Sequence, residues 1–156
     1  MIAIAAVSEN GGIGRDGQLL FSLRADLKRF RELTLGHTVL LGRKTLATFP
    51  GGKCLPGRRN VVLTSDVSFA APDAVVVHSL PEALAAAGED AFCIGGESVY
   101  RQFLPYCGEV WLTQVLAAPP ADCFFPSLED FAEVSRSPVQ EENGLSFQYV
   151  TYIRRA

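Results

Sequence analysis

The sequence lacks the marks of several protein classes. It contains only two histidines and four cysteines, and the cysteines are widely and irregularly spaced, without a C-x-x-C pair. This spacing indicates neither a zinc site nor a disulfide framework, and it suits a reducing cytoplasm. No apolar run reaches the roughly 18 residues of a membrane-spanning helix. We therefore expect no metal site and no membrane segment.

The chain also lacks an excess of positive charge. Its 14 Lys and Arg residues are outnumbered by 17 Asp and Glu residues, which gives a formal net charge of -3. A non-specific nucleic-acid binder would show a basic stripe, so nucleic acid is not an expected partner. A local basic pocket for a small anion stays open. The apolar residues 1–7 follow no basic segment, which favours a buried first strand over a signal peptide.

The length of 156 residues, of which 48% are hydrophobic, suits one domain with a single core spanning residues 1–156. The sequence contains no internal repeat, linker or low-complexity segment. It also shows no heptad pattern and no long apolar edge, so we expect a monomer.

Strand and helix patterns alternate along most of the chain, and two strand patterns stand together at its end. Expected strands lie at 2–8, 38–41, 60–64, 74–78, 91–94, 109–115, 131–137 and 146–154; expected helices lie at about 21–36, 43–49, 81–87 and 97–104. This order predicts an α/β fold in which a mainly parallel sheet carries an antiparallel C-terminal edge. The continuous apolar strands at 60–64 and 74–78 are expected to be buried on both faces.

The stretch 21–30 reads as the start of an amphipathic helix, with an inward stripe formed by Leu23, Leu27 and Phe30. Asp26 borders that stripe, where desolvation disfavours the charged carboxylate. Two interpretations are open for Asp26. It is either an acid at the edge of a surface helix, close to the positive end of the helix dipole, or a functional group.

Residues 12–17 satisfy the pattern G-x-G-x-x-G after a strand, but four residues separate them from the next helix. A dinucleotide fingerprint needs the helix to open inside the motif, so that its N-terminus faces the pyrophosphate. We therefore reject a Rossmann motif here. The glycine-rich loop at 9–20 is instead interpreted as a mobile loop without regular structure.

Two strand ends have better chemistry for binding an anion. One carries Gly42, Arg43, Lys44 and Thr45, which would turn backbone N–H groups and two cations toward one ligand. The other is the segment 95–98, where paired glycines let the backbone approach a ligand closely. Ligands of open α/β sheets bind at the carboxyl ends of the strands. Two such segments at strand ends of one sheet therefore favour a ligand site more strongly than either segment alone.

Short blocks of residues that match a known family lie at 4–6, 12–14, 25–27 with 30, 39–45, 55–60, 94–96 with 99–100, 112–113, and 122 with 125–126. In the order and spacing of these blocks, the sequence resembles the bacterial dihydrofolate reductases over nearly its whole length. The resemblance implies a three-layer fold with an eight-stranded sheet and about four helices. It also implies NADPH-dependent reduction of 7,8-dihydrofolate to tetrahydrofolate for one-carbon metabolism, and binding of antifolate inhibitors.

The resemblance assigns residues to three sets. The catalytic set holds the carboxylate of Asp26, Thr113 hydrogen-bonded to it, and Leu19 and Phe21 ahead of the helix. Arg58 matches the arginine that pairs with the glutamate carboxylate of the substrate. The other substrate contacts are Ile4, Ala5, Leu27, Phe30, Phe49, Leu55, Ile94 and Tyr100. The cofactor contacts are Ala6, Ile13, Gly14, Gly42, Arg43, Lys44, Thr45, Leu63, Thr64, Ser65, Gly95, Gly96, Glu97, Ser98, Val99 and Tyr100, with a cis peptide joining Gly95 to Gly96.

The chain departs from the family pattern at a few positions. Leu20 and Phe21 stand where Pro-Trp or Pro-Phe is usual, so the indole N–H of a tryptophan is missing. Ser98 stands where an arginine often binds the 2′-phosphate of the cofactor, and Arg43 with the hydroxyls at 64 and 65 is left for that role. The segment 50–53 is slightly longer than in the common bacterial form.

Two other functions remain open from the sequence. One is a reductase of riboflavin synthesis on the same fold, which would not need Asp26 together with Arg58. The other is a non-catalytic protein that binds a pterin or a nucleotide.

Overall fold

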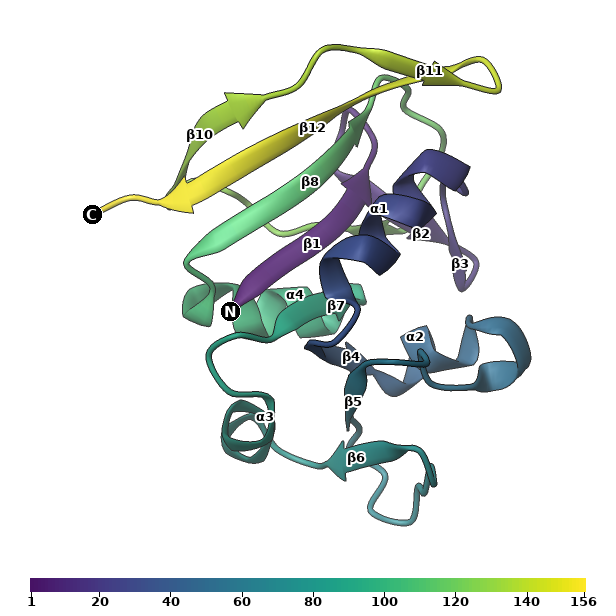
Figure 1. The fold of residues 1–156 in the computed structure, drawn as a ribbon, viewed down its shortest axis with the longest axis vertical. Helices are drawn as coiled ribbons and strands as arrows, with labels where there is room; N and C mark the ends of the chain where they lie inside the picture. Colours follow the sequence, from purple (N-terminus) through teal and green to yellow (C-terminus); the bar gives the residue numbers. More distant parts are fainter.

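The structure is a computed structural model that describes all 156 residues. One large sheet organises the chain, and eight of its strands lie in the order β10-β12-β8-β1-β7-β4-β5-β6 (Figure 1). Their bounds are β1 Ile2–Val7, β4 Thr38–Gly42, β5 Arg59–Leu63, β6 Ala74–Val77, β7 Phe92–Gly95, β8 Glu109–Val115, β10 Phe131–Arg136 and β12 Leu145–Arg154. The short strand β11, Gln140–Glu142, pairs with β12 at the side of this path.

The strands from β8 to β6 are parallel, and β12 joins β8 in the antiparallel sense, as does β10 with β12. The helices are α1 Arg24–Thr34, α2 Arg43–Ala47, α3 Leu80–Ala87 and α4 Glu97–Phe103, with short 3-10 turns at Pro50–Gly52 and Leu104–Tyr106. The expected fold class, a mainly parallel eight-strand arrangement with an antiparallel C-terminal edge and four helices, is confirmed.

Helices cover both faces of the sheet. Along β4 the side chain of Leu40 belongs to a core cluster that includes residues of α3 and α4, such as Ala83 and Phe103. Its neighbours Val39 and Leu41 belong to a second cluster, against which Phe30 of α1 packs. Successive side chains of a strand point to opposite faces, so α1 and α2 lie on one face and α3 and α4 on the other.

The strands at 60–64 and 74–78 are expected to be buried on both faces, and this prediction is correct for the first of them only. Val61 and Val62 of β5 are fully buried, as predicted. Val75 of β6 is 37% exposed, so the prediction is wrong there. The reason is position, since β6 is the edge strand and pairs with β5 alone.

The loop predicted at 9–20 contains regular structure, so that prediction is wrong. Strands β2, Gly12–Arg15, and β3, Gln18–Leu19, form a hairpin, and β9, Cys123–Phe124, pairs with β2. The turn residues Asp16 and Gly17 both have positive φ, 51° and 76°. Asp-Gly is the sequence that such a two-residue hairpin turn prefers, and it was available in the sequence.

Helix α1 begins at Arg24, three residues later than predicted, because Leu23 is extended with φ -106° and ψ 125°. Phe21 and Leu23 instead pack beside Val115 and Phe147 in a third, smaller cluster. All four cysteines are free thiols. No helix of the structure has both the length and the apolar character needed to cross a membrane.

Candidate active site

Asp26 lies in the first turn of α1, and its side chain reaches β8. The hydroxyl of Thr113 on β8 donates a hydrogen bond to Oδ1 of Asp26. Burial raises the pKa of the Asp26 carboxyl, and the bond from Thr113 and the charge of Arg29 only partly oppose this effect. The site therefore holds a half-buried carboxyl group that keeps its proton to higher pH than an exposed aspartate.

The sheet brings the partners of Asp26 together. Thr113 is 2% exposed and lies opposite Ala6 of β1 on one side and Tyr149 of β12 on the other. The guanidinium of Arg29, one turn along α1 from Asp26, lies 4.0 Å from the ring centre of Tyr149, a cation–π contact. Figure 1 shows β1, β8 and β12 side by side, with α1 near β1. Helix α1 is thus held to β8 through Asp26 and to β12 through Arg29.

Tyr100 of α4 reaches the same region from the opposite face. It is 4% exposed, and its hydroxyl donates a hydrogen bond of 2.7 Å to the carbonyl of Ile4. A Cβ added at Gly95 would lie 3.1 Å from the Tyr100 ring, and Gly95 has φ +114°. Glycine suits this position because its positive φ disfavours any side chain and the Tyr100 ring crowds the place of a Cβ.

The ends of β4 and β7 meet as the sequence predicted. Leu41 pairs with Gly95, and the peptide bond between Gly95 and Gly96 is cis, as the resemblance implied. A Cβ on Gly96 would lie 3.3 Å from the hydroxyl of Thr45. The two strand ends meet in a backbone cradle formed by Gly42, Gly95 and Gly96, where side chains of Val99, Tyr100 and Thr45 approach the positions that a Cβ would take.

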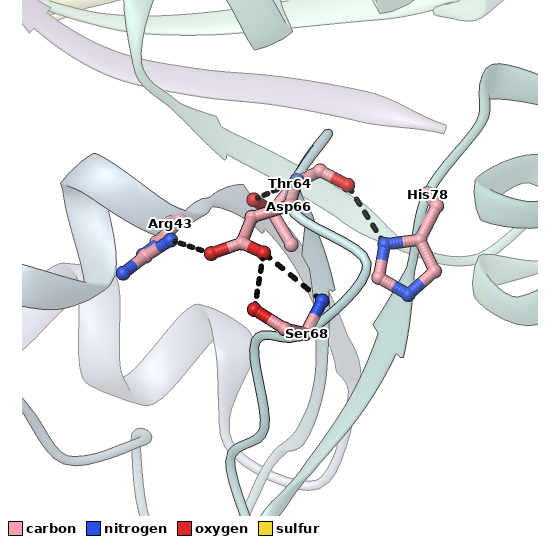
Figure 2. A network of polar contacts seen from close by, with 5 residues as sticks. All are labelled: Arg43, Thr64, Asp66, Ser68 and His78. Atoms are coloured by element: carbon pink, nitrogen blue, oxygen red, sulfur yellow. Dashed lines mark hydrogen bonds and ion pairs between the residues drawn. The ribbon is translucent and has the colours of Figure 1, made fainter.

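Arg43, at the start of α2, belongs to a polar network at the end of β5 (Figure 2). Its Nη1 donates to Asp66 at 2.8 Å, and its guanidinium lies 4.5 Å from the ring centre of Phe69. Asp66 also accepts bonds from the backbone and the hydroxyl of Ser68, which lower its pKa further than Arg43 does. The backbone N–H of Asp66 donates to the Thr64 hydroxyl at 3.1 Å. Arg43 and Thr64, predicted from separate segments, are thereby joined through one residue.

Other predicted cofactor residues lie in different settings. Val99 is 4% exposed and Ile13 is 8% exposed, and both belong to the large core cluster. Glu97 accepts bonds from Arg101 and from the backbone of Phe124, so it ties α4 to β9.

Four further members of the predicted cofactor set, and Leu19 of the predicted catalytic set, are placed as follows. Ser98 accepts a bond from Gln102, Leu63 packs partly buried against the large core cluster, and Ser65 and Lys44 are exposed, as is Leu19 at 65%.

An open cavity of about 690 Å³ lies beside the predicted substrate residues, and Phe49, Leu55 and Arg58 are among its lining residues. Arg58 donates from Nε to the carbonyl of Pro56 at 3.0 Å and from Nη1 to the Thr34 hydroxyl at 3.3 Å. None of the lining residues belongs to α1 or β8, so this cavity, called the outer cavity below, does not include Asp26 or Thr113. Phe30, Phe49, Leu55 and Ile94 all pack against one core cluster.

One predicted orientation is wrong. Leu27, expected on the inward stripe of the helix, is 52% exposed, whereas Leu23 is buried. A 3.6-residue period indicates which side chains share a helix face, and it cannot tell whether protein or an open cleft lies opposite them.

Three residues that contact predicted site segments receive no site role from the sequence. Arg29 contacts Tyr149 beside Asp26, Asp122 accepts the backbone N–H of Asp16 at 2.9 Å, and Glu142 accepts backbone bonds from the start of α1. The Asn143-Gly144 pair, with φ 52° and 78°, is a hairpin signal. It could have located the β11–β12 turn, although not the contact that Glu142 makes. No group of three or more His, Cys, Asp and Glu side chains is placed to hold a metal ion.

A family model described as dihydrofolate reductase matches residues 1–154. The chain belongs to the dihydrofolate reductase family. A dihydrofolate reductase from Mycobacterium leprae is 37% identical over 158 residues, which cover 97% of this chain and 96% of that protein. One from Staphylococcus haemolyticus is 33% identical, with 97% and 93% covered. A solved dihydrofolate reductase from Enterococcus faecalis, complexed with NADP(H) and RAB-propyl, has a TM-score of 0.89 at 33% identity, with 99% and 96% covered.

Dihydrofolate reductases transfer a hydride from NADPH to 7,8-dihydrofolate and form 5,6,7,8-tetrahydrofolate. The chain is an NADP-dependent oxidoreductase of this kind, with NADPH as its cofactor. The match over nearly the full length of several reductases favours this activity over the riboflavin reductase and the non-catalytic binding protein.

Proposed function

We propose that Asp26 is the group of this dihydrofolate reductase that binds and activates the pterin ring of dihydrofolate. The observation that carries the proposal is the carboxyl of Asp26, half-buried, raised in pKa and bonded to Thr113. An acid with a raised pKa, bonded to a buried threonine of β8, has the properties of a group that takes part in proton transfer.

The hydrogen-bond pattern leaves an acceptor site on each oxygen of Asp26 for a ligand. Thr113 donates to Oδ1, and Oδ2 accepts no hydrogen bond from the protein. A carboxylate can accept two parallel N–H bonds from a planar amino-pyrimidine edge. We assign this edge of the pterin to Asp26. The ring nitrogen that gains the proton is distant from that edge, so Asp26 favours its protonation through water rather than by direct donation.

The fold offers a site of matching chemistry for NADPH, which supplies the hydride when bound. The cradle at Gly42, Gly95 and Gly96 suits the pyrophosphate, with Lys44 and Thr45 beside it. Arg43, Thr64 and Ser65 are assigned to the 2′-phosphate, with Arg43 and Thr64 both bonded to Asp66. The residues assigned to the nicotinamide end are Ala6, Ile13, Gly14 and Leu19.

The tail of dihydrofolate ends in a glutamate whose carboxylates need a cation. Arg58 lines the outer cavity, and its guanidinium fork matches a carboxylate. The apolar residues Phe30, Phe49, Leu55 and Ile94 pack in one cluster, and we assign them, with the exposed Leu27, to the walls around the pterin and benzoyl rings.

The decisive test follows the loss of NADPH absorbance after addition of dihydrofolate to the purified protein. We expect turnover by the wild type and loss of most turnover in Asp26→Asn, which keeps the shape of the side chain and loses its charge. Binding of methotrexate without turnover by the wild type would instead support a binding protein. Near-normal turnover by the variant would remove Asp26 from the mechanism.

We further propose that residues 1–156 form one domain that acts as a cytoplasmic monomer. One sheet spans the chain from β1 to β12, and the four thiols are unpaired, which suits a reducing compartment. Sedimentation equilibrium of the purified chain tests the monomer, and a dimer at micromolar concentration would contradict it.

A further inference from the structure

The N-terminus of α1 is not capped by the residue that precedes it. Leu23 occupies the N-cap position and has no side chain that can accept a bond. The first bond of the helix runs from the N–H of Leu27 to the carbonyl of Leu23. The N–H groups of Arg24, Ala25 and Asp26 therefore lack acceptors within the helix.

Glu142 of β11 accepts two of these three N–H groups. Its Oε2 accepts from Arg24 at 2.6 Å, and its Oε1 accepts from Ala25 at 3.0 Å. The two bonds lower the pKa of Glu142, so its carboxylate is ionised at neutral pH. A residue 118 positions along the chain from Arg24 thus supplies the cap, which favours a negative charge at this end of the helix.

Three neighbouring strands, β11, β12 and β8, connect the two contacts to the first turn of α1. Glu142 lies opposite Leu145 across the β11–β12 hairpin. Further along β12, Tyr149 lies opposite Thr113 of β8, and Thr113 holds the carboxyl of Asp26. The backbone of this helical turn and its acidic side chain are therefore fixed to one continuous piece of sheet.

We propose that Glu142 is a positioning residue that holds the first turn of α1, and with it Asp26, against β8. The inference rests on the proposed role of Asp26. It differs from a simple stabilising cap in one respect: the carboxylate of Glu142 also repels the charge of Asp26, so it affects the pH at which the active-site acid ionises.

The ionisation of Asp26 depends on several groups around it. Burial raises its pKa most, the Thr113 bond and Arg29 lower it, and Glu142 raises it. The charged or titratable groups that face Asp26 or Glu142 come from four elements and are Arg24 and Arg29 of α1, Tyr100 of α4, Glu142 of β11 and Tyr149 of β12. Removal of the Glu142 charge removes one repulsive partner, so the pKa of Asp26 falls.

The first experiment measures kcat/KM for dihydrofolate against pH in the wild type, Glu142→Gln and Glu141→Gln. The rate falls at high pH because the reaction needs a proton, and we expect this fall to move to lower pH in Glu142→Gln, with a several-fold lower kcat/KM at neutral pH. Glu141 is the matched control, because it is an exposed acid on the same strand with no hydrogen bond to α1. An unchanged profile in Glu142→Gln, or an equal shift in Glu141→Gln, would overturn the proposal.

A second experiment tests the cap itself by thermal unfolding. Arg24→Pro deletes one of the two N–H donors, and proline suits the first helical position after the extended Leu23. Arg24→Ala deletes the side-chain charge and keeps the N–H. We expect Glu142→Gln to lower Tm less in the Arg24→Pro background than in the Arg24→Ala background. An equal loss of Tm in both backgrounds would show that the bond from Arg24 contributes nothing.

Asp26→Asn separates failure of this inference from failure of the proposed function. If the variant keeps turnover and the high-pH fall of the wild type, Asp26 is not the acid and the proposed function fails. If Asp26→Asn loses turnover while Glu142→Gln keeps the wild-type profile, only the positioning role of Glu142 is refuted.

Discussion

Thr113→Val gives the sharpest test of how the active-site acid is held. Valine has nearly the shape of threonine, so the buried position stays filled, and the variant loses the one donor that reaches Oδ1 of Asp26. A hydrogen bond to a charged group contributes about 1.5–3 kcal/mol. For a domain of this size each kcal/mol shifts Tm by roughly 2–4 °C, so we expect Tm to fall by about 3–12 °C at about pH 8.

The pH dependence of this loss of stability shows whether the Thr113 bond acts on an ionised carboxylate. The Thr113 bond lowers the pKa of Asp26, so its contribution is largest when the carboxyl is ionised and declines as pH falls through the folded-state pKa. A bond to the neutral acid contributes only about 0.5–1.5 kcal/mol. The destabilisation in Thr113→Val should therefore shrink by roughly half at about pH 4. The high-pH fall of the reaction rate should move to higher pH, opposite to the shift expected for Glu142→Gln.

Thr113→Ser is the matched control for these melts. It keeps the hydroxyl and deletes one buried methyl group, at a cost of about 1 kcal/mol that should not change with pH. Urea or thermal melts of both variants at the two pH values make the comparison. Equal destabilisation by Thr113→Val at both pH values would refute the idea that the bond acts on an ionisable acid.

Three further outcomes follow from the site. Because burial raises the pKa of Asp26, the ionised acid destabilises the fold, and Asp26→Asn should be at least as stable as wild type in urea melts at pH 7, an advantage that disappears below the ordinary aspartate pKa. Arg58→Ala should raise KM for dihydrofolate roughly 10- to 100-fold and leave KM for NADPH nearly unchanged; Arg59→Ala is the neighbouring control, and equal effects on both KM values would contradict the assignment. Arg43→Ala should weaken binding of NADPH about tenfold more than binding of NADH, measured by fluorescence titration, and equal weakening would argue against a 2′-phosphate contact.

Local patterns in the sequence predict most of the fold. The predicted strand 109–115 has the same bounds as β8, and Pro81 correctly marks the start of α3. Both predictions succeed because the spacing of apolar residues and the residues that start or stop an element are local properties of the sequence. The Gly95-Gly96 pair likewise marks the end of β7 and the start of α4 in the sequence. The Asp16-Gly17 pair is also a local signal, for a two-residue hairpin turn, so the hairpin of β2 and β3 is predictable from the sequence.

The parts of the site that escaped prediction depend on distant contacts. Nothing near Glu142 in the sequence indicates that it faces a helix 118 residues away, since an acid in a polar hairpin usually faces water. The exposure of Leu27 depends on what stands opposite α1 in space. Asp66, which joins Arg43 to Thr64, gained its role only when the ends of β4 and β5 came together.

The place of β1 in the sheet has a consequence for synthesis of the chain. This strand is made first, but its neighbours β8 and β7 begin at Glu109 and Phe92. At about 5–20 residues per second, β1 waits on the order of 5–20 s before both partners exist. Such distant pairings give slow folding, and during that interval an apolar strand has two unpaired edges. The central strand of the finished enzyme thus stays without a partner in the nascent chain for longer than any other strand of the sheet.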